Sequence, residues 1–233
     1  MRIADSITLT ITPLTLFALL TGCATSGQNE VLPTPSIVLR SSPIVQERPT
    51  SIETAVKTKH FYDSRLNPEG DFRERHQGRL VKKSNGLRSV IVDTKTGLMW
   101  QRSGTAGLSA GHERVMRWYI DKLNRSKFAG HSDWRLPTVE EAMSLMEKEK
   151  NGNGLHISPL FDGRQWGIWT SDFLGTRPGV SGQDPEAEIG DQELPGFVTG
   201  CPWHVNYETG VCGPLQNSHF LYVRAVRSFS SAE

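Results

Sequence analysis

The side chains of this chain with the most obvious chemical capacity are gathered in FAGHSDWRLPTVEEAMSLMEK, residues 128–148. His131 and Asp133 alternate, so on an extended segment both face one side and resemble an acid–base pair. Catalysis would need a nucleophile or a metal ion as a third member, and the serine between them faces the other way. Arg135 can instead bind a carboxylate, for which Asp133 or Asp172 is the natural partner.

The same stretch has the features of a structural joint between an extended segment and a helix. Pro137 holds the preceding residue in an extended conformation. Thr138 and Glu141 have the spacing of a helix capping box, and Trp134 is a natural buried anchor. We therefore favour a joint over a catalytic loop. Its members are His131, Asp133, Trp134, Arg135, Pro137, Thr138 and Glu141.

The two cysteines near the C-terminus flank a predicted hairpin, CPWHVNYETGVC. The chain has three cysteines, and with Cys23 set aside as the lipidation site described below, two remain. An even remainder in an exported protein predicts a disulfide, here between Cys201 and Cys212. His204 and His219 lie nearby, but their spacing fits no standard metal site. The sequence therefore predicts no metal site and no cofactor.

A run of basic residues could bind an anionic polymer. Residues 73–88 contain six lysines or arginines and a single glutamate. The best candidates for such binding are Arg79, Lys82, Lys83 and Arg88, with Arg73 and Arg75 before them. The alternative is a solvated edge strand that its charges protect from aggregation.

Aromatic residues offer a second kind of binding surface. Trp166, Trp203 and Tyr207 could stack on sugar rings, or they could be part of the core; Trp169 is expected in the core. Alternating acidic residues at 184–193 could bind calcium, but they lack calcium-loop spacing and are expected to be solvated.

The N-terminus resembles a bacterial lipoprotein signal peptide. An apolar run from Ile7 to Leu20 is followed by Thr21, Gly22 and Cys23. Residues 1–22 would be removed, and the thiol of Cys23 would carry a diacylglycerol anchor. The residue after the cysteine is not aspartate, so the usual sorting rule favours the outer membrane. We expect a lipid-anchored protein of the bacterial cell envelope, facing the periplasm or the cell surface.

Composition divides the rest of the chain into a tether and one globular domain. Residues 23–58 are rich in Ser, Thr and Pro, so we expect a disordered tether, and residues 59–233 form the globular domain. The 233 residues have a net charge of +1, which suggests no nucleic-acid partner.

Hydrophobic periodicity predicts two helices among short strands. Residues 111–130 form the first, with Val115, Trp118, Tyr119 and Leu123 on one face; the second begins at the Thr138 cap. Strands are expected around residues 79–102, 164–173, 201–212 and 219–228. This order predicts an α+β fold with two helices packed on short antiparallel strands.

Several motifs occur in a recognisable order: GLMW, GHSDWRLPT, WTS and VRAVR. Over about residues 79–228 the chain closely resembles the Lcl C-terminal domain family of bacterial exported and surface proteins. The resemblance implies a C-type-lectin-like fold, shared with formylglycine-generating enzymes, and attachment to surface polymers. The chain departs from the family pattern in reading SNGLRS where an Asp-Gly-Thr run is usual, and it has no collagen-like stalk.

Two functions stay open at this point. The first is a non-catalytic envelope binding module for a polysaccharide or a protein partner. The alternative is a metal-dependent enzyme related to the formylglycine-generating enzymes, with His131, His204 or His219 as its base.

Overall fold

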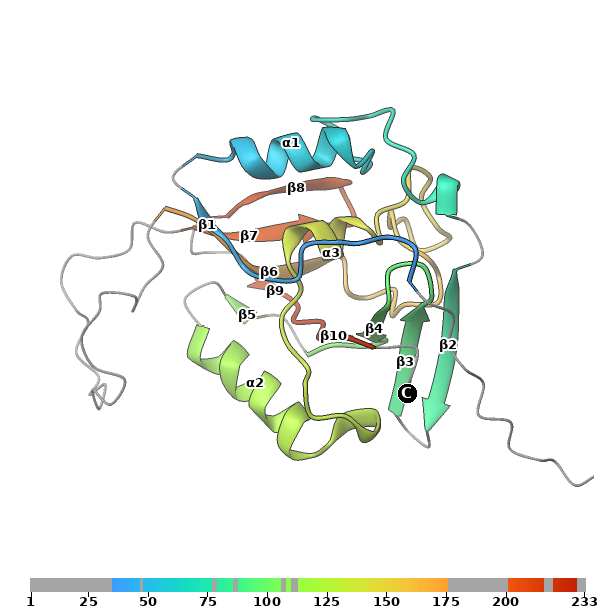
Figure 1. The fold of residues 1–233 in the computed structure, drawn as a ribbon, viewed down its shortest axis with the longest axis vertical. Helices are drawn as coiled ribbons and strands as arrows, with labels where there is room; N and C mark the ends of the chain where they lie inside the picture. Colours follow the sequence, from blue (N-terminus) through green and yellow to red (C-terminus); the bar gives the residue numbers. More distant parts are fainter. Residues whose placement is uncertain are drawn as a thin grey trace, which may run out of the picture. The chain divides into compact units, whose positions relative to one another are not determined.

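Two four-stranded β-sheets and three α-helices form the part of the chain that the structure describes (Figure 1). In this computed structural model the described residues are 35–46, 48–76, 79–85, 88–105, 108–109, 113–175, 201–215 and 220–229. All of them belong to one unit, Val31–Glu233. The mixture of helices with antiparallel-rich sheets confirms the predicted α+β class.

The first sheet has the strand order β1-β6-β7-β8. β1 runs parallel to β6, and the other neighbours are antiparallel. β7 and β8 form the predicted hairpin. The strands are β1 (Val45–Gln46), β6 (Gly167–Leu174), β7 (Cys201–Asn206) and β8 (Val211–Pro214).

The second sheet is antiparallel throughout, with the order β10-β4-β3-β2. β4 carries the GLMW motif, and its four residues are buried between its neighbours and the rest of the core. The strands are β2 (Leu80–Asn85), β3 (Arg88–Asp93), β4 (Leu98–Gln101) and β10 (Val226–Ser228). A separate two-stranded sheet pairs β5 (Leu108–Ser109) with β9 (Phe220–Leu221).

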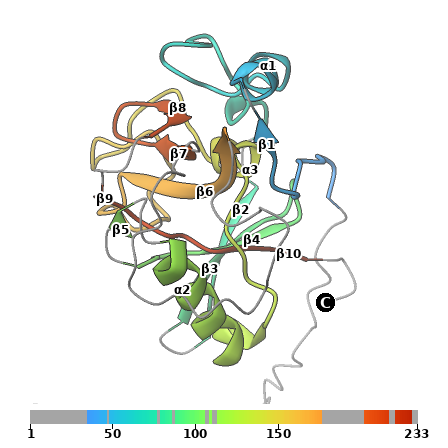
Figure 2. The same ribbon diagram turned by 90° about the vertical axis from the view of Figure 1, so that its left-hand side faces the viewer.

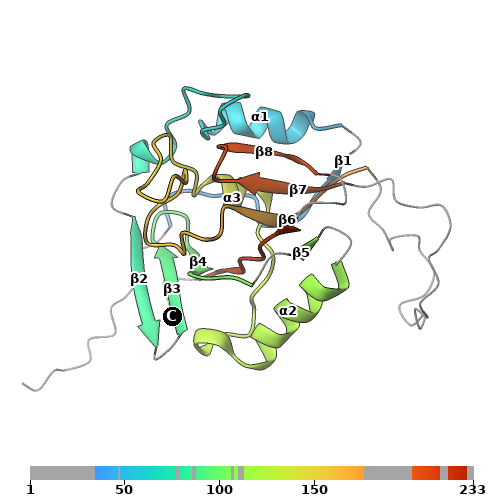
Figure 3. The ribbon, with the colours of Figure 1, turned by 180° about the vertical axis from the view of Figure 1, so that it is seen from behind.

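The three α-helices lie in different places around the two sheets. α3 contacts α1, β6 and β7 (Figure 2), whereas α2 lies beside β5 at the end away from α1 (Figures 1 and 3). The α-helices are α1 (Thr50–Thr58), α2 (Glu113–Arg125) and α3 (Val139–Met143), and the 3-10 helices are Glu74–His76 and Phe128–Gly130. Among the described residues, no helix has the length and apolar character needed to span a membrane.

The inward face of α2 differs from the predicted one. Met116 and Leu123 are buried, and Tyr119 and Ile120 pack between them, as expected for residues three and four positions apart. Trp118 is 54% exposed and lies against the ammonium group of Lys122. The prediction that Trp118 shares the core face was therefore wrong, because Met116 and Ile120 occupy that face.

The predicted tether is wrong for residues 35–58. Ile37, Leu39 and Ile44 pack against the main core, and β1 extends the first sheet. In α1, Ile52 and Val56 are both 1% exposed, because their i, i+4 spacing presents them together to the core. The segment is rich in Ser, Thr and Pro, but it also contains apolar residues that the domain buries. We call residues 35–46 the strap.

The predicted disulfide between Cys201 and Cys212 is absent, and both residues are free cysteines. The hairpin register places Cys212 opposite Val205, four residues along β7 from Cys201. That offset corresponds to about 13 Å, well beyond the ~7 Å limit between the Cα atoms of a disulfide. The two cysteines flank the turn in sequence, but strand pairing keeps them apart.

This separation predicts different reactivity of the two thiols. Burial and the nearby carboxylate of Asp63 raise the pKa of Cys212, whereas Cys201 is only half-buried. In the native protein, iodoacetamide should therefore modify Cys201 and leave Cys212 intact, because the thiolate is the reactive form. Peptide mapping by mass spectrometry would measure this, with the unfolded protein as the control in which both react. Recovery of a peptide that links Cys201 to Cys212 would contradict the register.

Candidate functional site

The predicted joint is fixed to the second sheet through its main chain. The N–H groups of Arg135 and Val226 each donate to the other residue's carbonyl, both at 2.9 Å. Pro137 is buried, and its carbonyl accepts a hydrogen bond from the N–H of Ser171 in β6 at 2.8 Å. The joint therefore connects β10 of one sheet with β6 of the other.

Trp134 ties the joint to the end of α2. Its side chain is 2% exposed, and its indole N–H donates to the carbonyl of Phe128 at 2.9 Å. The side chain of Asn124 brackets its backbone, accepting from the N–H of Trp134 at 2.7 Å and donating to its carbonyl at 2.9 Å. All three hydrogen-bonding groups of this buried residue are satisfied, as a structural anchor requires.

The capping box at α3 is confirmed. The N–H of Glu141 donates to the Thr138 hydroxyl at 3.3 Å, and the N–H of Thr138 donates to the Glu141 carboxylate at 2.9 Å. That carboxylate also accepts two bonds from the guanidinium of Arg135, both at 2.7 Å. Arg135 was predicted to bind Asp133 or Asp172. That prediction was wrong, because each of these aspartates is bound to another arginine.

Asp133 pairs with Arg227, whose Nε lies 2.6 Å from the carboxylate. Partial burial would raise the pKa of Asp133, but the hydrogen bond and charge of Arg227 hold it below its usual range. The imidazole of His131 lies edge-on to the Trp134 ring, with 6.5 Å between the ring centroids. The supposed acid–base pair is therefore part of the packing of the joint.

The capping box gives a direct test of the joint. Replacing Thr138 with alanine should lower the free energy of unfolding by about 1–2 kcal/mol, because one buried N–H of α3 loses its acceptor. The hydroxyl also donates to the carbonyl of Arg40 at 2.7 Å, which would be lost as well. Urea unfolding would measure the change. Thr138→Ser is the control and should retain most of the stability; equal losses in both variants would show that the hydroxyl is not responsible.

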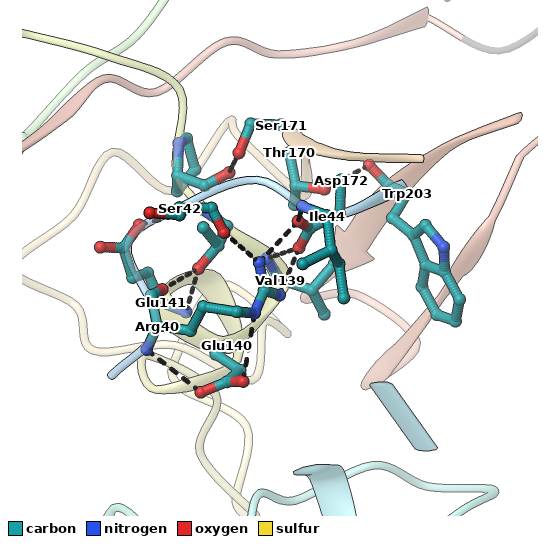
Figure 4. Close-up of polar contacts among 12 residues, drawn as sticks. Arg40, Ser42, Ile44, Val139, Glu140, Glu141, Thr170, Ser171, Asp172 and Trp203 are labelled. Atoms are coloured by element: carbon teal, nitrogen blue, oxygen red, sulfur yellow. Dashed lines mark hydrogen bonds and ion pairs between the residues drawn. The ribbon is translucent and has the colours of Figure 1, made fainter. Parts of the chain in front are cut away.

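A group of charged side chains that the sequence did not reveal fastens the strap to the domain (Figure 4). The guanidinium of Arg40 donates to both carboxylate oxygens of Asp172, at 2.8 and 2.7 Å. Asp172 is fully buried and also accepts from the N–H groups of Ile44 and Val139, both at 2.8 Å. Burial alone would lower the pKa of Arg40, but Asp172 and Glu140 raise it.

We call the Arg40–Asp172 pair the clasp. An open pocket lies beside it. It has a volume of about 430 Å³, within the range of roughly 300–1,000 Å³ typical of small-molecule sites. The strap contributes Ser41 and Pro43 to its wall, and β6 contributes Ser171. The Arg40–Asp172 pair holds these two segments together. We call this cavity the α2 pocket.

The rest of the α2 pocket comes from the joint and from α2. Arg135 and Leu136 form one wall, while Arg117, Ile120 and Asp121 form the other. Two members of the predicted joint region thus line an open cavity. The sequence signal for this site was the GHSDWRLPT motif, but nothing in the sequence indicated that the strap would complete it.

The predicted basic surface is dispersed. Arg79 is 1% exposed and forms an ion pair with Asp93 at 3.2 Å; burial lowers its pKa to about 10 despite that partner. Arg73 pairs with Glu147, and Arg75 with Asp71. The prediction that Arg79 binds a ligand was therefore wrong, because its guanidinium is buried and paired with Asp93.

The remaining basic candidates lie on an edge hairpin. Lys82 is exposed and Lys83 is half-buried, on adjacent positions of β2, so they face opposite sides of an edge strand. Arg88 is exposed, and its guanidinium donates to the carbonyls of Ser126 and Lys127 and lies over the ring of Phe128. They do not form a common face with Arg79.

The aromatic candidates are mostly core residues. The side chains of Trp203 and Tyr207 are 1% and 0% exposed. The prediction that they stack on sugar rings was therefore wrong. The hydroxyl of Tyr207 donates to the carbonyl of Ala142, and burial raises its pKa. Trp169 is fully buried, as predicted, and Trp166 is half-buried against Tyr222.

Other predicted chemistry is not assembled in the described residues. Among them, no group of three or more His, Cys, Asp or Glu side chains could hold a metal ion. The Nδ1 atom of His204 lies 2.7 Å from the carbonyl of Gly213. His219, Cys23 and the acidic residues at 184–193 lie outside the described residues.

The expectation that the chain contains no Gly-x-Ser-x-Gly motif is wrong, because GLSAG occurs at residues 107–111. In hydrolases this pattern places the serine on a sharp turn between a strand and a helix. Here Ser109 belongs to β5 and pairs with Phe220 in an antiparallel two-stranded sheet. Ser109 ends β5, and the next element is α2; the turn between them, residues 110–112, lies outside the described residues.

Comparison with protein families supplies an identification for this arrangement. The family model of the Lcl C-terminal domain matches residues 89–227. The chain belongs to this family. The match spans β3 to β10 and includes the joint and the α2 helix. No curated protein and no solved structure matches the chain.

The limits of the match show what this chain adds to its Lcl C-terminal domain. The strap, α1 and β2 all precede the first matched residue. Two residues of the α2 pocket, Ser41 and Pro43, therefore lie outside the matched region, although they pack onto it.

Proposed function

We propose that the protein is a non-catalytic, lipid-anchored binding module of the bacterial cell envelope that recognises a polysaccharide or a protein partner. The observation that supports this best is the contrast between the joint and the space next to it. Asp133 and Arg135 are bonded to Arg227 and Glu141, while the α2 pocket is open to solvent. Groups locked in ion pairs stabilise a fold, and an open pocket beside them can hold a ligand.

An acid–base role fits the joint poorly. A general base must reach the proton that it takes and must change its protonation state near the working pH. Arg227 holds the pKa of Asp133 below its usual range, so the carboxylate stays ionised at neutral pH. The packing of His131 against Trp134 also has a purely structural explanation.

The alternative is a metal-dependent enzyme on the C-type-lectin-like fold that the family resemblance implies. Formylglycine-generating enzymes hold copper through a pair of cysteines. Cys201 and Cys212 do not fit such a site, because the register of β7 and β8 separates them by about four residues along the strand. We assign the C-type-lectin-like fold only as part of this proposal and transfer no reaction with it.

Lipid attachment at Cys23 makes a separate prediction. In the cell, Cys23→Ser should move the protein from the membrane fraction to the soluble fraction, because two or more acyl chains anchor stably and none would remain. Fractionation with labelled palmitate would measure both location and acylation. Cys201→Ser is the matched control and should stay membrane-bound. A Cys23→Ser protein that stays with the membrane, together with an unlabelled wild type, would contradict the anchor.

The binding function is tested with the full chain in detergent. We expect it to be retained on immobilised envelope polysaccharides or to capture one envelope protein in stoichiometric amount. A chain that begins at residue 59 would be a poor reagent, because it lacks Ile52 and Val56 of the core. Retention of neither class of partner, by a protein shown to be folded by its melting curve, would contradict a binding function.

A further inference from the structure

The charges around the α2 pocket balance one another. Arg135 is neutralised by a two-bond ion pair with Glu141, whose side chain is 1% exposed. Asp121 follows Arg117 by one turn of α2, so the helix contributes one charge of each sign to the lining. An anionic polymer would therefore meet no net positive charge in this cavity.

The uncharged part of the lining combines apolar surface with hydroxyl groups. Pro43, Ile120 and Leu136 provide apolar contact, while Ser41 and Ser171 carry hydroxyls, each able to donate and to accept. A sugar ring has the matching character, because its C–H faces are apolar and its rim is made of hydroxyls. The carboxylate of Asp121 and the guanidinium of Arg117 add an acceptor and donors for such hydroxyls.

From this balance we propose that the α2 pocket is a binding site for a neutral saccharide. The inference rests on the proposed binding function and narrows it to one site and one ligand class. The balance of charges favours a neutral saccharide over a sulfated or uronic-acid polymer and over a charged peptide. Specificity for the sugar comes from hydroxyl contacts over an apolar floor.

The strap is a required wall of this site. Ser41 and Pro43 reach the pocket because the Arg40–Asp172 pair fixes the residue just before them. These two residues precede the matched Lcl C-terminal domain, which begins at residue 89. Ligand preference is therefore set partly by a segment that belongs to this chain and not to the matched domain.

Two neighbouring serines provide a matched test. Ser41 and Ser42 are both exposed on the strap, but only Ser41 lines the pocket. The full chain in detergent is first applied to an array of neutral oligosaccharides of glucose, galactose and N-acetylglucosamine, beside sulfated and uronic-acid polysaccharides. Calorimetry with the best neutral probe then compares wild type, Ser41→Trp and Ser42→Trp. We expect Ser41→Trp to raise Kd by at least about tenfold, because the indole fills the cavity, and Ser42→Trp to bind like wild type.

Melting curves establish that each variant is folded. A second variant, Asp121→Asn on the exposed face of α2, should also weaken binding. Neutral binding that Ser41→Trp and Asp121→Asn leave unchanged would overturn the pocket while the binding function stands. Retention of anionic polymers alone would overturn the neutral ligand class and again leave the function intact. An array without any retained glycan overturns the inference, and capture of an envelope protein then decides the proposed function separately.

Discussion

Replacing Asp172 with alanine is expected to lower the free energy of unfolding by about 3 kcal/mol. This carboxylate is fully buried and holds three donors in place: the guanidinium of Arg40 and the N–H groups of Ile44 and Val139. Without it, the buried N–H of Val139 and the part-buried N–H of Ile44 lose their acceptor, and Arg40 loses its main partner. We take the lower end of the range for a broken buried pair because Arg40 keeps 21% of its side chain exposed. Chemical denaturation would measure the change.

Asp71→Ala is the matched control for this experiment. Asp71 also pairs with an arginine, Arg75, at 2.6 Å, but both side chains are well exposed. Exposed pairs contribute little to stability, so this variant should unfold at nearly the wild-type denaturant concentration. Equal losses in the two aspartate variants would show that the buried clasp has no special role. Proteolysis of the strap should also become faster in Asp172→Ala alone.

Truncating Trp134 to alanine should have the other large effect, a loss of about 3–5 kcal/mol. The indole is 2% exposed and packs with Val90, Val92, Leu123 and Phe229 in a second core cluster. Its removal leaves a cavity and also frees the carbonyl of Phe128 from its donor. The end of α2 and the joint would lose their common anchor, so we expect a clear drop in melting temperature.

Trp118→Ala tests whether burial, and not residue type, sets this cost. Trp118 lies on α2, whose end Trp134 anchors, but it is 54% exposed, with Lys122 as its ring contact. Surface substitutions usually change stability by no more than about 0.5 kcal/mol, so the melting temperature should barely move. A Trp134→Ala protein as stable as Trp118→Ala would contradict the structural joint.

Features that depend on residues close in sequence could be predicted. The Thr138–Glu141 capping box spans three positions, and its two hydrogen bonds are formed within the turn that it begins. The strand with the GLMW motif and the β7–β8 hairpin follow equally from local patterns of apolar and turn residues. Local geometry alone determines these contacts, since the partners are adjacent before the rest of the chain folds.

Predictions that required a choice among distant partners failed. Arg135 was expected to bind Asp133 or Asp172, but it binds Glu141, because Arg227 and Arg40 occupy the two aspartates. A guanidinium fits any carboxylate, so residue type could not decide among them. The prediction of a disulfide failed for a similar reason. Two cysteines can flank a turn in the sequence without facing each other across the hairpin, because the strand register decides which residues are opposite.

The sequence by itself determined the α+β class, the family and the structural joint, because these depend on periodicity and on motifs of neighbouring residues. Only the tertiary structure decided the role of the strap and the composition of the α2 pocket. The Arg40–Asp172 pair joins positions 132 residues apart, and the strap's composition resembles that of an unfolded tether. Its few apolar residues become core residues only when the two sheets provide a surface to bury them, and a pocket wall exists only after that burial has occurred.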